Sequence, residues 1–272
     1  MTDAKTYLCY LKSTRPTGRV MAKELGVSSF GIRRPTHASL DVLIRWGSCA
    51  DMPPAGVVIN HPEAIANASH KLRAIQLMRR AGVHTVPAYQ TWEEASREAA
   101  VIFGRSFRGF GGRDIVVYKP HSGEVPQRHH DFYTMYMDAP REARLHVVGD
   151  KVVRTQIKYN DHPEHNGDGY IRNYKHGYRF RAPKDELHMN RRMTAINAVR
   201  ACGLDFGAVD LLVYGDNQNY VLEVNTAPAC SPLTARCYAG ELAILVHART
   251  NGAIRLSPSV MEAEISYEEM ED

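Results

Sequence analysis

Three oxygen-bearing side chains lie near the ends of two apolar segments in the C-terminal third of the chain. The segment GAVDLLVYGDNQNYVLEVN, residues 207–225, predicts a β-hairpin with its turn at Gly-Asp-Asn. Asp210 then faces Glu223, and Asn225 follows on the same side because side chains alternate along a strand. Opposed carboxylates repel each other and are unfavourable among apolar neighbours without a counter-charge. Carboxylate and amide oxygens are ligands that Mg²⁺ prefers, so the pattern predicts a metal site at these three residues.

The metal interpretation depends on the register of this hairpin. The expected register pairs Tyr214 with Asn219 and Leu212 with Val221, and a slip of one residue would separate the carboxylates. Three other interpretations stay open on the residues alone. The segment could be a solvent-facing polar strand end, one carboxylate could be protonated, or one could pair with an arginine.

A second candidate for chemistry is the glycine-rich stretch RSFRGFGGR, residues 105–113. Its glycines would let backbone N–H groups approach phosphate oxygens, and its three arginines would supply positive charge. The stretch matches neither the GxxxxGKS/T nor the GxGxxG phosphate-binding pattern, and it leads from one predicted strand into another. A flexible hairpin tip with solvated arginines is the alternative interpretation.

The elements that must position these residues form an α+β (α/β) pattern. The N-terminal region predicts a small α/β unit from the strands TYLCYL, LDVLIRWG and AGVVINHP and the helix GRVMAKELGV. Helices follow at ANASHKLRAIQLMRRAGV and at TWEEASREAA, which Thr91 opens. From residue 101 onward strands prevail. They flank the glycine-rich stretch and continue through DFYTMYM, ARLHVVG and KVVRTQIKY.

Toward the C-terminus, the polar, aromatic and basic stretch 160–185 predicts a functional loop. It is followed by the helix DELHMNRRMTAINAVRACG, the hairpin 207–225 and a final helix, PLTARCYAGELAILVHART. The acidic segment 256–272 predicts a loose tail.

Composition argues against several functional classes. No stretch approaches the roughly 20 apolar residues of a membrane span, and the N-terminus lacks the features of a signal peptide. The five cysteines are scattered without a CxxC pair, which favours free thiols in a reducing cytoplasm. The net charge of +4 fits a phosphate-bearing ligand. Nucleic-acid binding is disfavoured because no RNA-binding or zinc-finger pattern accompanies the charge.

The 13 histidines include two local groups in polar stretches, His129-His130 and His162 with His165. The sequence HPEH at 162–165 lacks the HExxH spacing of a helical zinc site. We therefore interpret these histidines as loop residues rather than metal ligands.

The order of these features resembles the ATP-grasp superfamily. Strand, glycine-rich loop and strand are followed by EAR (142–144), GDKVV, Arg172-Asn173, AVDLL and LEVNTAP. This order is similar to that of the RimK-like carboxylate–amine ligases, and closest to the COOH–NH2 ligase-type proteins of phages and bacteria. With the upstream segments RWGS and VINHPEAIANASHKLRAIQLMRRAGVHTVP, the resemblance covers most of residues 40–240. The hairpin with LEVNTAP is its most specific part.

The resemblance implies an ATP-grasp fold, in which two α+β subdomains hold ATP behind a small N-terminal α/β domain. It divides the chain into that domain at 1–65, the first subdomain at 66–140, the second with the metal site at 141–255, and the acidic tail at 256–272. The implied activity is an ATP-dependent, ADP-forming ligation of a carboxylate to an amine through an acyl phosphate, on an amino acid, peptide or protein. The implied cofactors are ATP and Mg²⁺ or Mn²⁺.

The resemblance also assigns roles position by position. It implies that Asp210, Glu223 and Asn225 hold the metal. The residues expected to bind the nucleotide are Arg105, Gly109, Gly111, Gly112, Thr134, Met135, Tyr136, Met137, Asp138 and Lys158. The residues expected to face phosphate or the reacting carboxylate are Arg144, Arg172 and Asn173.

Within the nucleotide set, Arg105 stands where the family usually has a phosphate-contacting lysine, and the arginine keeps the charge. Residues 134–137 match the hinge whose backbone bonds adenine, with Asp138 near the ribose. Lys158 matches a second basic position, and the glycines match a flexible loop over the phosphates. One departure is Ala229-Cys230, where relatives often have a glycine directly after Asn-Thr-Ala-Pro, so the local turn is expected to differ.

Two alternatives to the ligase reading remain. The chain could be an ATP-grasp enzyme with another outcome, such as a kinase or a thiol ligase. It could also be a basic, nucleic-acid-binding phage protein that kept the fold and lost catalysis. Relatives often self-associate, so a homo-oligomer is an expected partner state, and no membrane partner is expected.

Overall fold

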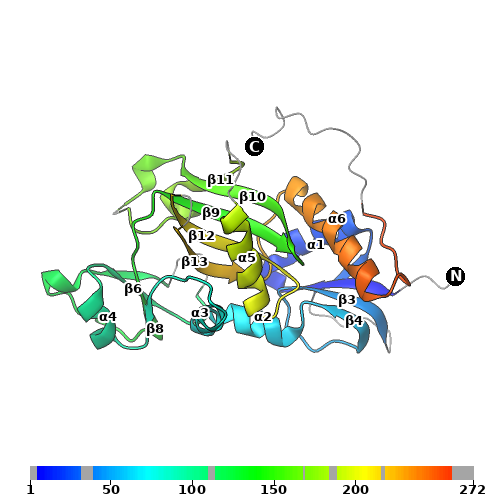
Figure 1. The fold of residues 1–272 in the computed structure, drawn as a ribbon, viewed down its shortest axis with the longest axis horizontal. Helices are drawn as coiled ribbons and strands as arrows, with labels where there is room; N and C mark the ends of the chain where they lie inside the picture. Colours follow the sequence, from blue (N-terminus) through cyan, green and yellow to red (C-terminus); the bar gives the residue numbers. More distant parts are fainter. Residues whose placement is uncertain are drawn as a thin grey trace.

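The computed structural model describes most of the chain. It covers residues 5–31, 39–109, 114–167, 169–183, 189–215 and 218–258. Three sheets follow one another along the long axis of the molecule: the N-terminal sheet, a five-stranded sheet and a small four-stranded sheet (Figure 1). None of the helices in these ranges is long and apolar enough to cross a membrane.

The N-terminal sheet is parallel and has the order β2-β1-β3-β4. Its strands are β1 (Thr6–Tyr10), β2 (Ser28–Phe30), β3 (Leu40–Trp46) and β4 (Ala55–Ile59). Helix α1 (Arg15–Leu25), preceded by the short η1 (Lys12–Thr14), connects β1 to β2. The sequence predicted β1, α1, β3 and β4. The exposed three-residue strand β2 was missed because it shows no apolar pattern.

Aromatic packing joins the N-terminal sheet to the five-stranded sheet. Trp46 at the end of β3 stacks on Phe206 with ring centroids 5.3 Å apart, and it meets Tyr238 edge-on at 5.4 Å. Tyr238 belongs to α6 (Pro232–Arg249), which packs against α1 as well as against the five-stranded sheet. One core therefore spans both units, and the domain boundary at residue 65 stays a prediction.

The long helix predicted at ANASHKLRAIQLMRRAGV is two helices in the structure, so that prediction was wrong. They are α2 (Pro62–Ser69) and α3 (Lys71–Arg80), separated by His70 with an extended backbone at φ −92° and ψ 95°. The Nδ1 atom of His70 accepts the backbone N–H of Arg73 and so caps α3. This break makes Lys71 the first residue of α3.

The small antiparallel sheet has the order β5-β8-β6-β7. Its strands are β5 (Ala88–Tyr89), β6 (Ile102–Arg105), β7 (Val116–Tyr118) and β8 (Phe132–Met135), and η2 (Pro120–Ser122) follows β7. Helix α4 (Trp92–Glu98) begins at a Thr91–Glu94 capping box, as Thr91 predicted, and packs its Trp92 against Tyr118 and Tyr133. Strands β6 and β7 flank the glycine-rich stretch, as predicted.

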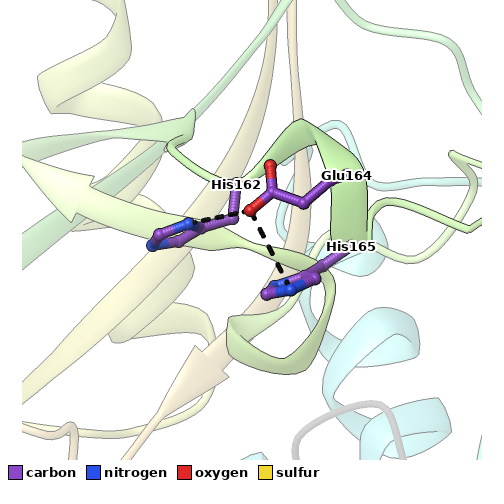
Figure 2. Close-up of side chains that lie close together, drawn as sticks. All are labelled: His162, Glu164 and His165. Carbon is purple, nitrogen blue, oxygen red and sulfur yellow. Dashed lines mark hydrogen bonds and ion pairs between the residues drawn. The ribbon is translucent and has the colours of Figure 1, made fainter.

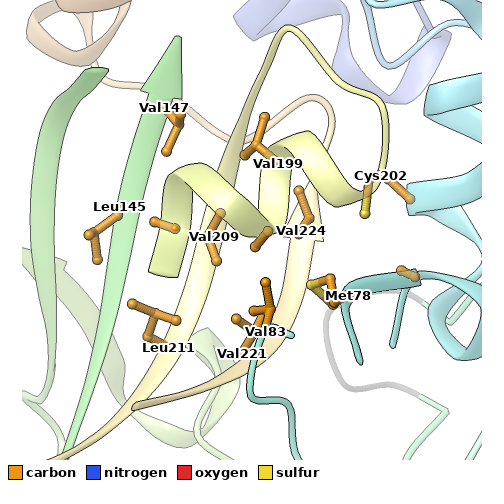
Figure 3. Packing of buried hydrophobic residues seen from close by; sticks show 14 of the residues in the cluster. Met78, Val83, Leu145, Val147, Val199, Cys202, Val209, Leu211, Val221 and Val224 are labelled. Atoms are coloured by element: carbon orange, nitrogen blue, oxygen red, sulfur yellow. The ribbon is translucent and has the colours of Figure 1, made fainter. Parts of the chain in front are cut away.

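The five-stranded antiparallel sheet, in the order β11-β10-β9-β12-β13, is the centre of the molecule. Its strands are β9 (Arg141–Val148), β10 (Lys151–Asn160), β11 (Tyr178–Arg181), β12 (Phe206–Tyr214) and β13 (Gln218–Asn225). Helix α5 (Met189–Ala201) covers one face. The core between α5 and the sheet includes Val199 of the helix and, from the sheet, Leu145, Val147, Val209, Leu211, Val221 and Val224 (Figure 3). Polar side chains that alternate with these valines and leucines therefore point to the opposite face.

The stretch 160–185 is more ordered than the predicted loop. It contains the short helices η3 (Pro163–His165) and η4 (Tyr174–His176) and then β11, which pairs with the end of β10. The strand escaped prediction because its YRFR sequence is half-buried and basic, as is typical of a charged edge strand. The connection between β10 and β11 is therefore anchored at both ends in the sheet.

The β12–β13 hairpin combines two registers. Near the turn, Tyr214 pairs with Gln218 and Leu212 with Tyr220, so the predicted partners Asn219 and Val221 were wrong by one residue. A β-bulge then leaves Leu222 without a partner and restores the predicted pairing of Asp210 with Glu223. The carboxylates are thus opposed as predicted, but through a bulge that the sequence did not reveal.

All five cysteines are free thiols, as predicted. Burial raises the pKa of Cys230 to about 12, so its thiol stays protonated and unreactive at neutral pH, as expected for a structural cysteine. Residues 259–272 of the predicted tail lie outside the described residues.

A close approach at Gly47 generates the first prediction. Gly47 and Gly82 both have left-handed backbones, at φ +71° and +76°, but only at Gly47 would a Cβ meet another residue, lying 2.7 Å from the Cβ of Ala227. Gly82→Ala should lower the free energy of unfolding by about 1–2 kcal/mol through backbone strain alone. Gly47→Ala should lose at least about 1 kcal/mol more because of overpacking. Urea unfolding measures both variants, and equal losses would contradict the contact with Ala227.

Candidate functional site

Charged residues from six elements meet on the face of the five-stranded sheet that lies opposite α5. The elements are α3, β6, β9, β10, β12 and β13, and the segment between β10 and β11 joins them at one side. Asp210 and Glu223 lie at the centre of this group. Their neighbours supply the counter-charge that two opposed carboxylates require.

Asp210 is buried and paired with Arg144 on the neighbouring strand. The register places Arg144 directly opposite Asp210, and its Nε and Nη2 atoms donate to the two carboxylate oxygens at 2.7 and 2.8 Å. Burial tends to lower the pKa of Arg144, but Asp210 outweighs it, and the net pKa lies above the ordinary value. The arginine pairing that the sequence left open is therefore present. Arg144 remains charged, and Asp210 is held rigidly in a fork-shaped contact.

Glu223 is ionised because cations surround it. Lys71 Nζ lies 3.2 Å from Oε2, and the Asn225 amide donates to Oε1 at 3.2 Å. Burial raises the pKa of Glu223, but Lys71, Arg105 and Arg144 together lower it to about 2. The hydrogen bond from Asn225 to Glu223 places the Asn225 side chain on the predicted side of the strand.

Arg105 at the end of β6 has unused hydrogen-bonding capacity. Its side chain is buried, and its Nε atom has no hydrogen-bond partner in the described part of the chain. Burial lowers its pKa, while Glu223 and Asp114 act in the opposite direction. A buried guanidinium with a free donor suits an anionic group that is brought to the site.

A second ion pair lies beside the first. Lys158 on β10 contacts the buried carboxylate of Glu142 and donates to the backbone carbonyl of Arg172 at 3.0 Å. Burial raises the pKa of Glu142, although Lys158 opposes this effect. The ring of Phe180 on β11 lies under both cations, 4.2 Å from the Arg144 guanidinium carbon and 4.9 Å from Lys158 Nζ. Phe180 therefore fixes the positions of two predicted site residues.

The predicted hinge connects the small sheet to the five-stranded sheet. Thr134 and Met135 belong to β8, and residues 136–140 cross to β9. The backbone N–H groups of Met135 and Tyr136 donate to Pro87 and Val101, so a nucleotide base would have to use other hinge atoms. Met137, one of the predicted nucleotide residues, is half-buried against an apolar cluster.

Arg172 ties the β10–β11 connection to the end of this hinge. It donates to the carbonyl of Ala139 at 2.8 Å and to Asp138 at 3.2 Å. Asn173 caps η4, with its Oδ1 atom accepting the backbone N–H of His176 at 3.1 Å. The structure thus places Arg172 close to Lys158, whereas Asn173 has a local structural contact.

The glycine-rich stretch borders an open cavity of about 540 Å³. The residues lining it are His70, Ser106, Phe107, Arg108, Gly109 and Asp131. A Cβ atom at Gly109 would clash with the Asp114 carboxylate, so a larger residue there would require the Asp114 side chain to move. Gly111 and Gly112 lie outside the described residues. The cavity adjoins the start of α3, because the Lys71 backbone N–H donates to the Phe107 carbonyl.

Three residues of the candidate site were not predicted from the sequence. Lys71 and Phe180 were not singled out, and Glu142 was noted only as part of the EAR segment. Lys71 lies 152 residues from its partner Glu223, so no local pattern could connect them. Phe180 sits in a strand that had been predicted as a loop.

Comparisons with known proteins agree on the fold. No family model matches the chain. A curated protein from Haemophilus influenzae (strain PittEE), "Probable alpha-L-glutamate ligase", is 27% identical over 190 residues, and the match spans 62% of this chain and 59% of that protein. The ATP-grasp ligase PsnB, solved with a precursor variant, Mg and ADP, superimposes with a TM-score of 0.64 at 13% identity, covering 91% of this chain and 99% of that one.

The D-alanyl-alanine synthetase A of Vibrio cholerae O1 superimposes with a TM-score of 0.66 at 11% identity, covering 92% of this chain and all of that one. The chain has the ATP-grasp fold. This confirms the α+β fold class and the ATP-grasp fold predicted from the order of motifs. Within the ATP-grasp fold, the carboxylate pair lies on the large sheet, and the glycine-rich stretch extends from the small one.

The Lys71–Glu223 contact generates a prediction for the protein without nucleotide or added metal. Lys71→Met leaves the Glu223 carboxylate with one counter-charge fewer. The free energy of unfolding at pH 7 should fall by about 2 kcal/mol. This value lies between the loss of roughly 0–1 kcal/mol expected when an exposed ion pair is broken and the loss of roughly 3–5 kcal/mol expected for a buried pair. The control Lys151→Met removes an exposed lysine that contacts Glu241, and it should change stability by less than about 1 kcal/mol.

The pH dependence of the same variant identifies the group responsible. The pKa of Glu223 falls from 4.5 to about 2 in the folded protein, so its contribution is present above pH 4.5 and is lost as the pH falls toward 2. Urea unfolding should therefore show the gap between wild type and Lys71→Met narrowing in acid. A gap that stays constant from neutral pH into acid would mean that Lys71 does not act through the charge of Glu223.

Proposed function

We propose that this protein is an ATP-dependent, ADP-forming carboxylate–amine ligase, which forms an amide bond on an amino acid, a peptide or a protein. The observation that carries the proposal is the pair Asp210 and Glu223, which cations contact on both strands in an ATP-grasp fold. The similarity to a probable α-L-glutamate ligase supports the reaction class. Because the match spans 59% of that protein, its substrate is not carried over.

The oxygen donors of the site fit a magnesium ion. Asp210 and Glu223 are adjacent across the two strands, and Asn225 adds an amide group beside Glu223. Each carboxylate oxygen that accepts one hydrogen bond from Arg144 or Lys71 keeps a further lone pair for a metal. These three residues would hold Mg²⁺ or Mn²⁺, which would supply positive charge to neutralise the phosphates of ATP. Mg and ADP in the PsnB structure support the same pair of cofactors.

The cations divide into two groups around the carboxylates. Arg105 and Lys71 lie on the side of the glycine-rich cavity, where they would neutralise the transferred phosphoryl group. Lys158 and Arg172 lie on the side of the β10–β11 connection, where they would orient the substrate carboxylate. Arg144 lies between them and holds Asp210 in place. This arrangement favours positioning and charge stabilisation over a protein nucleophile.

The reaction proceeds in two steps. A carboxylate oxygen of the substrate attacks the γ-phosphorus of ATP, forming an acyl phosphate as the bond to ADP breaks. The amine nitrogen of the second substrate then attacks the acyl carbon, inorganic phosphate leaves, and the nitrogen loses a proton. The glycine-rich stretch above the cavity would exclude water, which would otherwise hydrolyse the acyl phosphate. The five free thiols fit a reducing cytoplasm as the site of this reaction.

The test is ADP release with Mg-ATP, measured over a panel of amino acids and short peptides. Glu223→Gln keeps the shape of the side chain and removes its charge, so turnover should fall at least about 100-fold. The control Glu93→Gln, an exposed carboxylate on α4, should keep wild-type turnover. Mg-ATP should also raise the Tm of the wild type but not that of Glu223→Gln.

The same assay separates the alternatives. ADP release that requires no amine would indicate a kinase if the phosphoryl group stays on the product, or a hydrolase if inorganic phosphate is released. Product formation with a thiol would indicate a thioester-forming enzyme. Full activity in Glu223→Gln would remove the metal assignment. Absence of both turnover and a thermal shift, together with steeply salt-dependent binding to DNA, would overturn the ligase proposal in favour of a nucleic-acid-binding protein.

A further inference from the structure

We propose that His162, Glu164 and His165 form a second metal site, which takes a transition-metal ion of the zinc class and is separate from the Asp210–Glu223 site. Figure 2 shows the Glu164 carboxylate between the two imidazole rings. Its Oε1 atom lies 3.2 Å from His162 Nδ1 and 3.9 Å from His165 Nε2, and the ligand atoms of the cluster all lie within 4.8 Å of one another. The three side chains converge on one point, as the ligands of an ion must.

The spacing of these atoms is close to that of a zinc site. Zinc binds imidazole nitrogen and carboxylate oxygen at about 2.0–2.2 Å, so two ligands in a tetrahedral arrangement lie about 3.4 Å apart. The distances of 3.2 and 3.9 Å bracket that value, and small side-chain rotations would close the set around an ion. Three protein ligands leave a fourth position for water or for an outside group.

The local backbone explains how the HPEH sequence brings its two histidines together although it lacks the HExxH pattern. HExxH places its histidines four residues apart, which matches an α-helix. Residues Pro163–His165 instead form the 3-10 helix η3, in which residues three apart lie above each other. His162 is the cap of this helix and His165 its last residue, so the two rings stack with centroids 5.5 Å apart. Pro163 at the first position fixes the backbone that holds them.

The segment is also anchored to its neighbour before any ion arrives. The backbone N–H of Asp161 donates to the Gly177 carbonyl at 3.0 Å, and that of His162 donates to Asn160 Oδ1 at 3.3 Å. Gly177 has φ +85°, and a Cβ there would lie 2.3 Å from the His162 carbonyl oxygen, so this tight packing of η3 against η4 requires glycine. A site held this way loses little conformational entropy when it closes on an ion.

The donor set separates this site from the Asp210–Glu223 site. Two imidazoles and one carboxylate suit Zn²⁺, Co²⁺, Ni²⁺ or Cu²⁺, whereas Mg²⁺ prefers an oxygen-only set. An exposed ion pair between Glu164 and protonated histidines is the alternative, and such pairs add little stability. A bound ion would fix the side chains of η3, which lies within the connection that carries Arg172.

The first experiment is equilibrium dialysis of untagged protein against Zn²⁺ in a buffer that contains Mg²⁺ and no nucleotide. Wild type should bind one Zn²⁺ per chain near neutral pH. The double variant His162→Asn/His165→Asn should weaken binding at least about tenfold. The matched control His121→Asn/His129→Asn removes two exposed histidines elsewhere and should bind like wild type.

A second measurement identifies the ligands and the place. Bound Co²⁺ should give visible absorption without a thiolate charge-transfer band, which excludes the exposed Cys49 as the ligand. Zn²⁺ should slow hydrogen exchange in residues 161–167 of the wild type and leave the double variant unchanged. Glu223→Gln should keep its zinc stoichiometry, so this result is independent of the ligase proposal. Binding that survives in the double variant, a thiolate spectrum, or no stoichiometric binding would each overturn the second site.

Discussion

Asp210 and Glu223 face each other on adjacent strands, and two negative charges held this close must be compensated from nearby. Each carboxylate has its own cation, Arg144 for Asp210 and Lys71 for Glu223. These cations come from different parts of the fold. Arg144 lies opposite Asp210 because β9 and β12 are neighbouring strands of the large sheet. Lys71 lies in the first turn of α3, which is far from Glu223 in the sequence. The need to balance the buried Asp210 and the half-buried Glu223 therefore ties α3 to the edge of the five-stranded sheet.

Three further cations lie on two sides of this pair. Lys158 and Arg172 are paired with Glu142 and Asp138, whereas the Nε atom of Arg105 has no hydrogen-bond partner in the described part of the chain. An anionic ligand with several phosphate groups would lower the repulsion among these cations as it binds. The ring of Phe180 stabilises two of the neighbouring cations through cation–π contacts, because it lies against both Arg144 and Lys158.

Features that depend on contacts between residues close in the sequence could be predicted, whereas features that depend on contacts between distant residues could not. The alternation of apolar residues on β12 and β13, the cap at Thr91 and the order of motifs were sufficient for the fold class. The pairing of Asp210 with Glu223 was predicted from a register that is wrong near the turn and is restored only by the bulge at Leu222. Lys71 could not be found, because its role depends on a contact across 152 residues and on the helix break at His70. Strand β11 was missed because half-buried edge strands carry charged residues and lose their apolar pattern.

The unpaired Leu222 has a consequence that reaches beyond the hairpin. Side chains on a strand alternate between the two faces of the sheet. One additional residue in a strand therefore moves every side chain after it to the opposite face. Without that reversal, Leu222 would be paired with Asp210, and Glu223 would point into the apolar layer beneath α5. The bulge at Leu222 thus decides whether the Glu223 carboxylate lies on the side of Asp210 or among the valines beneath α5.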